Sequence, residues 1–359
     1  MKNQKILWGA LLILLIVMPL VLSDFRLSLL SKFLVFSIVA ISINLLWGYT
    51  GILSLGHGVY FALGGYAMAM YMKLQAQPLP DFMEWSGVSE LPWFWKPFQS
   101  LPFALAMVVL LPVSLALLVG IPLFKSGTKG VYFTILSQAI TLIIGILFVG
   151  QQAYTGGTNG ITGFSGFMGF TMSDPQLVKV LYFLSAFMLI AVYMLSRFML
   201  KTHGGTIIQA IRDRETRLRF LGYPTDWFKV VILATSAGIA GVAGAIFVPI
   251  VGIISPSSMS ILASTEFAIW VAIGGRATLL GPIVGAIVVN IAKTGFSESM
   301  PDFWWYFYGF LFIAATLIFP KGIVGSIEAK WAKRKAAAAP GKNEPVEEVP
   351  NLPIPVTSN

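Results

Sequence analysis

Cysteine is absent from the 359 residues, and only two histidines occur, His57 and His203. These absences exclude disulfide frameworks, thiolate zinc sites, cysteine nucleophiles and histidine-rich metal centres. Charge is also scarce, because Asp, Glu, Lys and Arg make up 11% of the chain, against roughly 25% in a soluble domain. The sequence has no G-x-x-x-x-G-K-[ST] phosphate loop, H-E-x-x-H zinc motif or G-x-S-x-G elbow. We therefore expect neither an ATPase site nor an enzyme.

Apolar residues dominate instead. They make up 57% of the chain, and the mean hydropathy is +0.81, too high for a soluble core to bury them all. A membrane span needs about 20 mostly apolar residues. Ten segments qualify or come close: 6–22, 29–49, 53–72, 103–123, 131–149, 180–198, 230–254, 261–274, 279–291 and 306–319. The sequence predicts an all-α, polytopic membrane protein with eight to ten transmembrane helices.

Two parts of the span assignment allow more than one interpretation: the first segment, and the eighth with the ninth. The opening segment has the basic start and apolar run of a signal peptide, but no A-x-A site follows it, so we interpret it as an uncleaved first span. The eighth and ninth segments are short and meet at residues 274–278, so they form either two spans or a re-entrant hairpin. Both choices leave the two chain ends on the same side of the membrane.

The distribution of positive charge orients the chain. With both termini in the cytoplasm, all but six of the 24 Lys and Arg residues fall on the cytoplasmic side, as the positive-inside rule requires. This explains the net charge of +9 without nucleic acid. We expect a transmembrane domain over residues 1–326, with a cytoplasmic loop at 199–229. A cytoplasmic tail over 327–359, rich in Ala, Pro and Glu, is expected to be disordered.

The loop at 199–229 carries the strongest local pattern. Gly204 and Gly205 open it, and Gly222 with Pro224 closes it. Between them, four apolar residues fall roughly on one helical face and arginines crowd the rest: Ile207, Ile211, Leu218 and Leu221, with Arg212, Arg214, Arg217 and Arg219. The pattern predicts a short amphipathic helix, which either lies on anionic lipid headgroups or docks on a partner protein.

Several stretches occur in the order found in one transporter family. They are LLWGYTGILSLGHGVYFALGGYA, KGVYFTILSQA, YTGGTNGITGF, AIRDRETRLRFLGY, SAGIAGVAGAIF and PKGIVG. In this the chain resembles the permease subunits of ABC importers for branched-chain amino acids and urea. The resemblance implies a bacterial inner-membrane permease without a cofactor of its own. Its expected partners are a second homologous permease, cytoplasmic subunits that bind ATP, an extracytoplasmic binding protein and membrane lipid.

The resemblance also gives the loop a role. In that family it forms the coupling helix, which is seated in a cleft of the ATPase subunit. The residues at the matching positions are Gly205, Ala210, Ile211, Arg212, Glu215 and Gly222.

The choice of substrate depends on two stretches, 79–98 and 264–286, which resemble the urea-type members of the family. We therefore expect urea. Branched-chain amino acids or another small amide, carried by the same type of importer, are the alternative. A secondary solute transporter is the alternative from a different class, but the spans contain few Asp, Glu or Lys residues for ion coupling.

Three residues are candidates for the substrate pathway. Glu266 and Trp270 lie four residues apart and share a helical face, so a carboxylate could accept N–H groups of urea while an indole stacks on its plane. The alternatives for Glu266 are a place among the headgroups or a charge on a partner subunit. His57 lies among glycines that can interrupt a helix beside a pathway, although hydrogen-bonded packing is the other reading. For the carboxylate of an amino acid, Arg276 is the one cation we expect in these spans.

Overall fold

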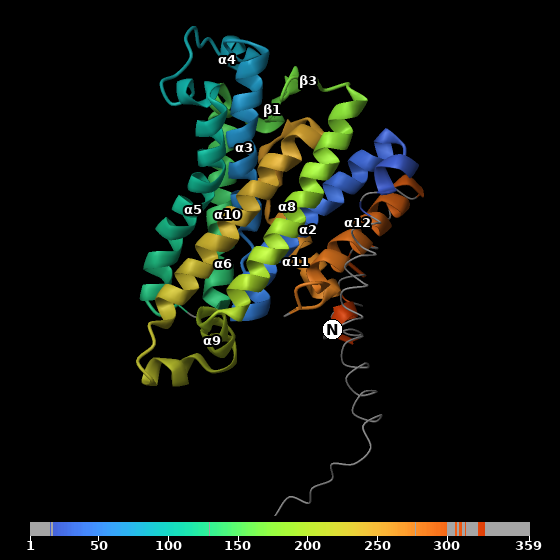
Figure 1. Cartoon of the computed structure of the whole chain (residues 1–359). Helices are drawn as coiled ribbons and strands as arrows, with labels where there is room; N and C mark the ends of the chain where they lie inside the picture. The colour runs from blue at the N-terminus through green and yellow to red at the C-terminus, as the bar shows by residue number, and fades with distance from the viewer. Residues whose placement is uncertain are drawn as a thin grey trace, which may run out of the picture.

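The computed structural model describes residues 15, 17–128, 130–276, 278–299, 306, 309, 310, 313 and 322–326. Its long helices run between two ends of the molecule, with α4 and the short strands at one end and α9 at the other (Figure 1). The long helices are α2 (Asp24–Thr50), α3 (His57–Ala76), α5 (Leu101–Lys125), α6 (Gly130–Gly150), α8 (Pro175–Lys201), α10 (Thr225–Val251), α11 (Ile261–Gly274) and α12 (Gly281–Ser299).

Shorter elements connect these helices. They are α4 (Asp81–Trp85), α7 (Gln152–Thr155), α9 (His203–Phe220) and the 3₁₀ helices η1 (Lys96–Gln99), η2 (Gly157–Asn159) and η3 (Pro256–Met259). Two antiparallel strand pairs join β1 (Ile161–Thr162) with β4 (Ile253–Ile254) and β2 (Gly166–Phe167) with β3 (Phe170–Thr171). The β1–β4 register pairs Ile161 with Ile254.

The all-α, polytopic prediction is confirmed. Each of the eight predicted spans from 29–49 to 279–291 coincides with a helix, and five helices, α2, α5, α6, α8 and α10, are long and apolar enough to cross a membrane. The first predicted span and the tail over 327–359 lie outside the described residues, apart from a few positions of the former. The tenth span is described only at scattered positions. The boundary between the transmembrane domain and the tail stays a prediction.

Helix α10 lies at the centre of the bundle and packs on α2, α3 and α5. Glycines allow its backbone to approach α3 closely. A Cβ added to Gly64 would lie 2.1 Å from the carbonyl oxygen of Gly241, and one added to Gly244 would lie 1.8 Å from that of Phe61. Lipid supplies no hydrophobic drive between helices, so close packing of small residues of this kind holds them together. Gly64 therefore belongs to a helix contact, and not to a break in α3.

The end of the molecule opposite α9 is fastened by one buried lysine. The ammonium of Lys73, at the C-terminal end of α3, pairs with Asp81 at 3.1 Å and donates to the Thr162 carbonyl at 3.1 Å. Its side chain is only 4% exposed. The loop that carries α4 and the loop that carries β1 are thereby both tied to α3, because a buried charge is costly unless it is paired.

We expect Gly64→Ala to weaken the α3–α10 contact, because the new methyl group would meet backbone and not a movable side chain. Overpacking of this kind costs roughly 1 to 3 kcal/mol. The measurement is thermal unfolding of the purified protein in detergent. Gly145→Ala on α6 is the control, because nothing lies within 4 Å of the Cβ it would add. Equal melting temperatures for the two variants would contradict the packing role.

Candidate translocation pathway and coupling segment

The backbone between α2 and α3 is not helical. Gly51 ends α2 in the left-handed region, with φ 78°, and residues 51–56 continue as an irregular segment. Side chains of α6 satisfy its polar groups: the Thr134 hydroxyl donates to the Leu53 carbonyl at 2.7 Å, and the Ser137 hydroxyl accepts from the Leu55 N–H at 3.1 Å. At membrane depth, non-helical backbone is tolerated where protein or a water-filled cavity replaces the lipid. Helix α3 is continuous from His57 to Ala76, so the interruption that the glycines predicted is not found within it, and residues 51–56 form the connection from α2 to α3.

A second irregular segment follows α10. Gly252, with φ 76°, ends that helix, and residues 252–260 run alongside α3 as β4 and η3. Gly65 faces the side chain of Ile254, whereas Gly58 faces the carbonyl of Ser258. The Gly58 N–H donates to the Ser264 hydroxyl, in the first turns of α11, at 3.0 Å. Helix α11 thus begins beside the first turn of α3, well inside the bundle.

A cavity of about 630 Å³ lies between α6 and this second segment. Its polar lining consists of hydroxyl side chains, and none of the described residues that line it is charged. Those hydroxyls belong to Thr141, Thr158, Ser257 and Ser260. Non-helical backbone at membrane depth is tolerated where it lines a cavity, and transporters place solute sites beside such backbone. This cavity is therefore the candidate translocation pathway.

Helix α6, which forms one wall of the cavity, buries little of its surface. Only 17% of its most apolar window is buried, against 72% for α10. Val131, Ile143 and Ile146 are among its exposed apolar residues, at 73, 65 and 71%. An apolar face of this kind suits lipid or a second membrane subunit.

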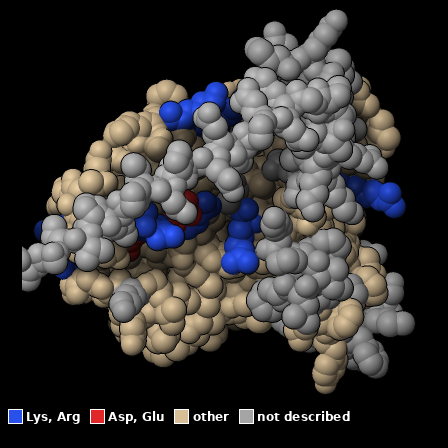
Figure 2. All heavy atoms as spheres, turned by 90° about the horizontal axis from the view of Figure 1, so that it is seen from below, with Lys and Arg blue, Asp and Glu red and all other residues tan. Residues whose placement is uncertain are grey.

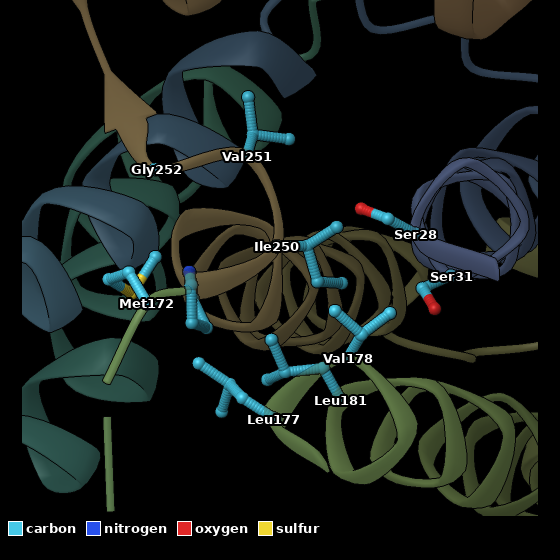
Figure 3. A pocket seen from close by; sticks show the side chains of 10 residues that line it. Ser28, Ser31, Met172, Leu177, Val178, Leu181, Ile250, Val251 and Gly252 are labelled. Atoms are coloured by element: carbon cyan, nitrogen blue, oxygen red, sulfur yellow. The ribbon is translucent and has the colours of Figure 1, made fainter. Parts of the chain in front are cut away.

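A further cavity, of about 260 Å³, lies between α2, α8 and the C-terminal end of α10 (Figure 3). Ser28 and Ser31 approach it from α2, and apolar side chains such as Leu177 and Ile250 approach it from α8 and α10. The Ser31 hydroxyl already donates to the Leu27 carbonyl at 2.8 Å. This cavity lies at a contact between helices, so we assign it no role in the pathway.

His57 packs in the interior of the helix bundle. Its side chain is fully buried, and its Nε2 lies 2.7 Å from the Ser236 hydroxyl. The Ser236 hydroxyl donates its single proton to the Ser42 carbonyl, so Nε2 must carry the proton of the imidazole. The chain His57–Ser236–Ser42 joins α3, α10 and α2. His57 does not line the candidate pathway, and a pathway role for it stays a prediction.

Glu266 pairs within its own chain. Its carboxylate lies 2.7 Å from the ammonium of Lys293 on α12, and its side chain is 14% exposed. A partner subunit is therefore not needed to neutralise it. Lys32 and Lys293 line the same small cavity as Glu266, so the expectation that Arg276 is the one cation of these spans is wrong. Arg276 lies 4.8 Å from the ring centroid of Trp47.

Trp270 does not present a free ring. It is 1% exposed, and its ring centroid lies 4.8 Å from that of Phe36 and 5.0 Å from that of Phe267. The carbonyl of Trp270 also meets the Gly285 position of α12, where an added Cβ would lie 2.0 Å away. Trp270 therefore helps to pack α11 against α2 and α12. A stacking role toward a solute stays a prediction that this packing does not support.

The predicted amphipathic loop helix is α9, but it is kinked. Arg214 has non-helical angles, φ −154° and ψ 71°, which divide the helix in two. The first half buries Gly205, Ile207, Ile208 and Ile211 against the bundle, while Ala210 beside them is half-buried. Ile211 is only 4% exposed because it packs against the bundle, and its part in coupling stays a prediction. One continuous apolar face over the whole loop cannot form, because the kink turns the second half away.

Each half of α9 is tied to a different long helix. The Arg212 guanidinium donates to the Gly48 carbonyl near the C-terminal end of α2, at 3.0 Å. In the second half, Glu215 pairs with Lys229 of α10, and Arg219 pairs with Asp226. Burial alone would raise the pKa of Glu215, but the hydrogen bond from Lys229 and the charges of Lys229 and Arg219 hold it below its usual range. The carboxylate is therefore ionised at neutral pH.

The second half of α9 leaves two large apolar side chains in solvent. Phe220 is 88% exposed and Leu221 is 72% exposed. Gly222 follows them with φ 84°, its N–H bonded to the Arg219 carbonyl and the Tyr223 N–H to the Leu218 carbonyl, which is the Schellman ending of a helix. Basic side chains gather in several groups on this end of the molecule (Figure 2). Our sequence prediction did not include Phe220, although its place just before the helix-ending Leu-Gly pair was the available signal.

These features define a class: a multi-pass membrane transport protein with irregular segments between its helices, a largely apolar cavity that carries four hydroxyls, and an exposed apolar tip on a basic loop. Comparison with known proteins gives the family. Residues 25–316 match the model described as branched-chain amino acid transport system / permease component, so the chain belongs to that family. Its members are permease components, and the chain is accordingly a transport subunit and not an enzyme.

Two similar proteins have the same name, high-affinity branched-chain amino acid transport system permease protein LivM. The one from Escherichia coli (strain K12) is 24% identical over 362 residues, which covers 94% of this chain and 78% of that protein. The one from Salmonella typhimurium (strain LT2) is 23% identical over 324 residues, covering 84% and 69%. No solved structure matches the chain.

The kink in α9 generates a prediction about coupling. Leu221→Asp should abolish ATP-driven uptake while the chain remains folded in the membrane, because residue 221 is exposed at the tip. Ile211→Asp should instead destabilise the chain itself, because it places an unpaired carboxylate in a site that is 4% exposed. Uptake, membrane content and thermal unfolding of both variants separate the two effects. Normal uptake by Leu221→Asp would show that the exposed tip is not a coupling contact.

Proposed function

We propose that this chain is the translocation subunit of an ATP-driven importer for urea in the bacterial inner membrane, with both termini in the cytoplasm. The observation that carries the choice of substrate class is that, among the described residues lining the cavity, none is charged and the polar side chains are all hydroxyls. Urea is neutral, with four N–H donors and one carbonyl acceptor. A hydroxyl can both donate and accept a hydrogen bond, so a hydroxyl lining suits such a solute. A zwitterion would leave both of its charges without partners there, at a high desolvation cost.

The energy for transport must come from a partner, because the sequence has no phosphate loop. A cytoplasmic ATPase is the partner that the proposal requires, and it would hold the ATP, so the chain itself needs no cofactor. The exposed tip formed by Phe220 and Leu221 is the apolar contact offered to it. The exposed face of α6 fits a second permease of the same family, which would close the open side of the cavity. An extracytoplasmic binding protein would deliver the solute.

Branched-chain amino acids are the second candidate. The two LivM proteins to which the chain is similar are named as branched-chain amino acid permeases, and the family carries the same description. An amino acid would need both a cation and a carboxylate along its path. Glu266 and Lys293 could supply these only after their 2.7 Å ion pair separates.

Uptake measurements separate the two substrates. Cells that lack only this chain should lose accumulation of labelled urea at low external concentration and keep that of labelled leucine, and the wild-type chain should restore urea uptake. Loss of leucine uptake with unchanged urea uptake would make the amino-acid alternative correct. Loss of neither would overturn the importer proposal for both substrates.

A single hydroxyl tests the cavity. Ser257→Ala removes one hydrogen-bonding group of the lining, and a neutral hydrogen bond contributes roughly 0.5 to 1.5 kcal/mol. We therefore expect the maximal urea transport rate in liposomes, at saturating binding protein, to fall about two- to tenfold. Ser114→Ala on α5 is the matched control, because that hydroxyl is exposed and bonds only within its own helix. Equal rates for both variants would remove Ser257 from the pathway.

A further inference from the structure

A small charged cavity lies between α2, α11 and α12, apart from the candidate pathway. Its volume is about 300 Å³, and its lining includes Lys32, Glu266 and Lys293. Leu29 and Phe33 supply an apolar wall beside these charges. The cavity thus combines cations with hydrocarbon, as a binding site for an amphiphile would.

The described lining of this cavity has two cations, Lys32 and Lys293, but one carboxylate, Glu266. Glu266 is 2.7 Å from Lys293, which occupies the carboxylate. Lys32 makes no hydrogen bond or ion pair to any described residue, and its ammonium lies over the ring of Phe36, 5.6 Å from the centroid. A second cation therefore faces a carboxylate that already has a partner.

The ammonium of Lys32 lies at a depth along α2 where an unpaired charge is costly. Lys32 is the ninth residue of α2, so roughly 12 Å of helix separates it from Asp24. Helix α2 is one of the five helices that are long and apolar enough to cross a membrane. Cations at such a depth are rare, and they pair with an anion or reach toward the interface.

We propose that this cavity binds the phosphate of an anionic phospholipid headgroup, with Lys32 as its principal ligand. A phosphodiester brings the oxyanion that the lysine lacks, and it arrives already attached to acyl chains that match the apolar wall. The carboxylate of Glu266 holds Lys293 beside the same cavity, so a second ammonium faces the bound anion. The volume accommodates the headgroup, while the chains remain in the bilayer.

The test uses the complete complex in nanodiscs that contain equal amounts of phosphatidylglycerol and phosphatidylcholine, with retained lipids counted by native mass spectrometry. Wild-type protein should retain phosphatidylglycerol in preference to phosphatidylcholine. Lys32→Gln should lower that preference about ten- to a hundredfold, which corresponds to the loss of one charge-assisted hydrogen bond. Lys32→Arg should keep it. Lys179→Gln, which removes an exposed lysine of α8, should keep it as well.

Equal retention by the wild type and Lys32→Gln would overturn the proposal. Displacement of the retained lipid by inorganic phosphate would assign the cavity to a soluble oxyanion, and displacement by leucine would assign it to an amino acid, so either result would overturn the lipid assignment. If Lys32→Gln fails to fold, thermal unfolding of the wild type decides: stabilisation by phosphatidylglycerol over phosphatidylcholine supports the proposal, and equal stability overturns it.

Discussion

The requirement that every backbone polar group find a partner away from water shapes this molecule more than any other constraint. Helices meet the requirement internally, but residues 51–56 and 252–260 cannot. In residues 51–56, two of these groups are satisfied by the Thr134 and Ser137 hydroxyls of α6, whereas Ile253 and Ile254 in the second segment pair with β1. The Thr134 and Ser137 hydroxyls of α6 therefore have a structural role.

The chain also links the loop that carries α9 to its interior through few contacts. Arg212 fixes the first half of α9 to α2, and Glu215 fixes the second half to α10. Within the bundle the Ser236 hydroxyl, bonded to the Ser42 carbonyl, joins the same two helices. A displacement of α9 would therefore reach α2 and α10 together. His57 attaches α3 to the same point, which brings the irregular segment before it into the linkage.

The sequence predicted the spans well because hydrophobic length is a strong signal, and all eight spans that the structure describes along their length are helices. It predicted the loop at 199–229 correctly as a helix between glycines, but it did not predict the kink that divides this helix. A prediction from hydrophobic periodicity assumes a straight helix. The residue types around Arg214 give no sign of the non-helical backbone angles that this residue adopts. The ion pair of Glu266 with Lys293 could not be predicted from the sequence either, because 27 residues separate the two partners.

The same reasoning explains why membrane charges must be interpreted from the structure. Glu266 and Lys293, like Lys73 and Asp81, are paired, and their burial follows from that pairing. A carboxylate in an apolar segment is evidence for a pathway only when no partner lies within reach. Glu266 has such a partner, whereas the hydroxyls at Ser257 and Ser260 line an open cavity without a charge. The uncharged groups are therefore the better guide to where a neutral solute crosses this subunit.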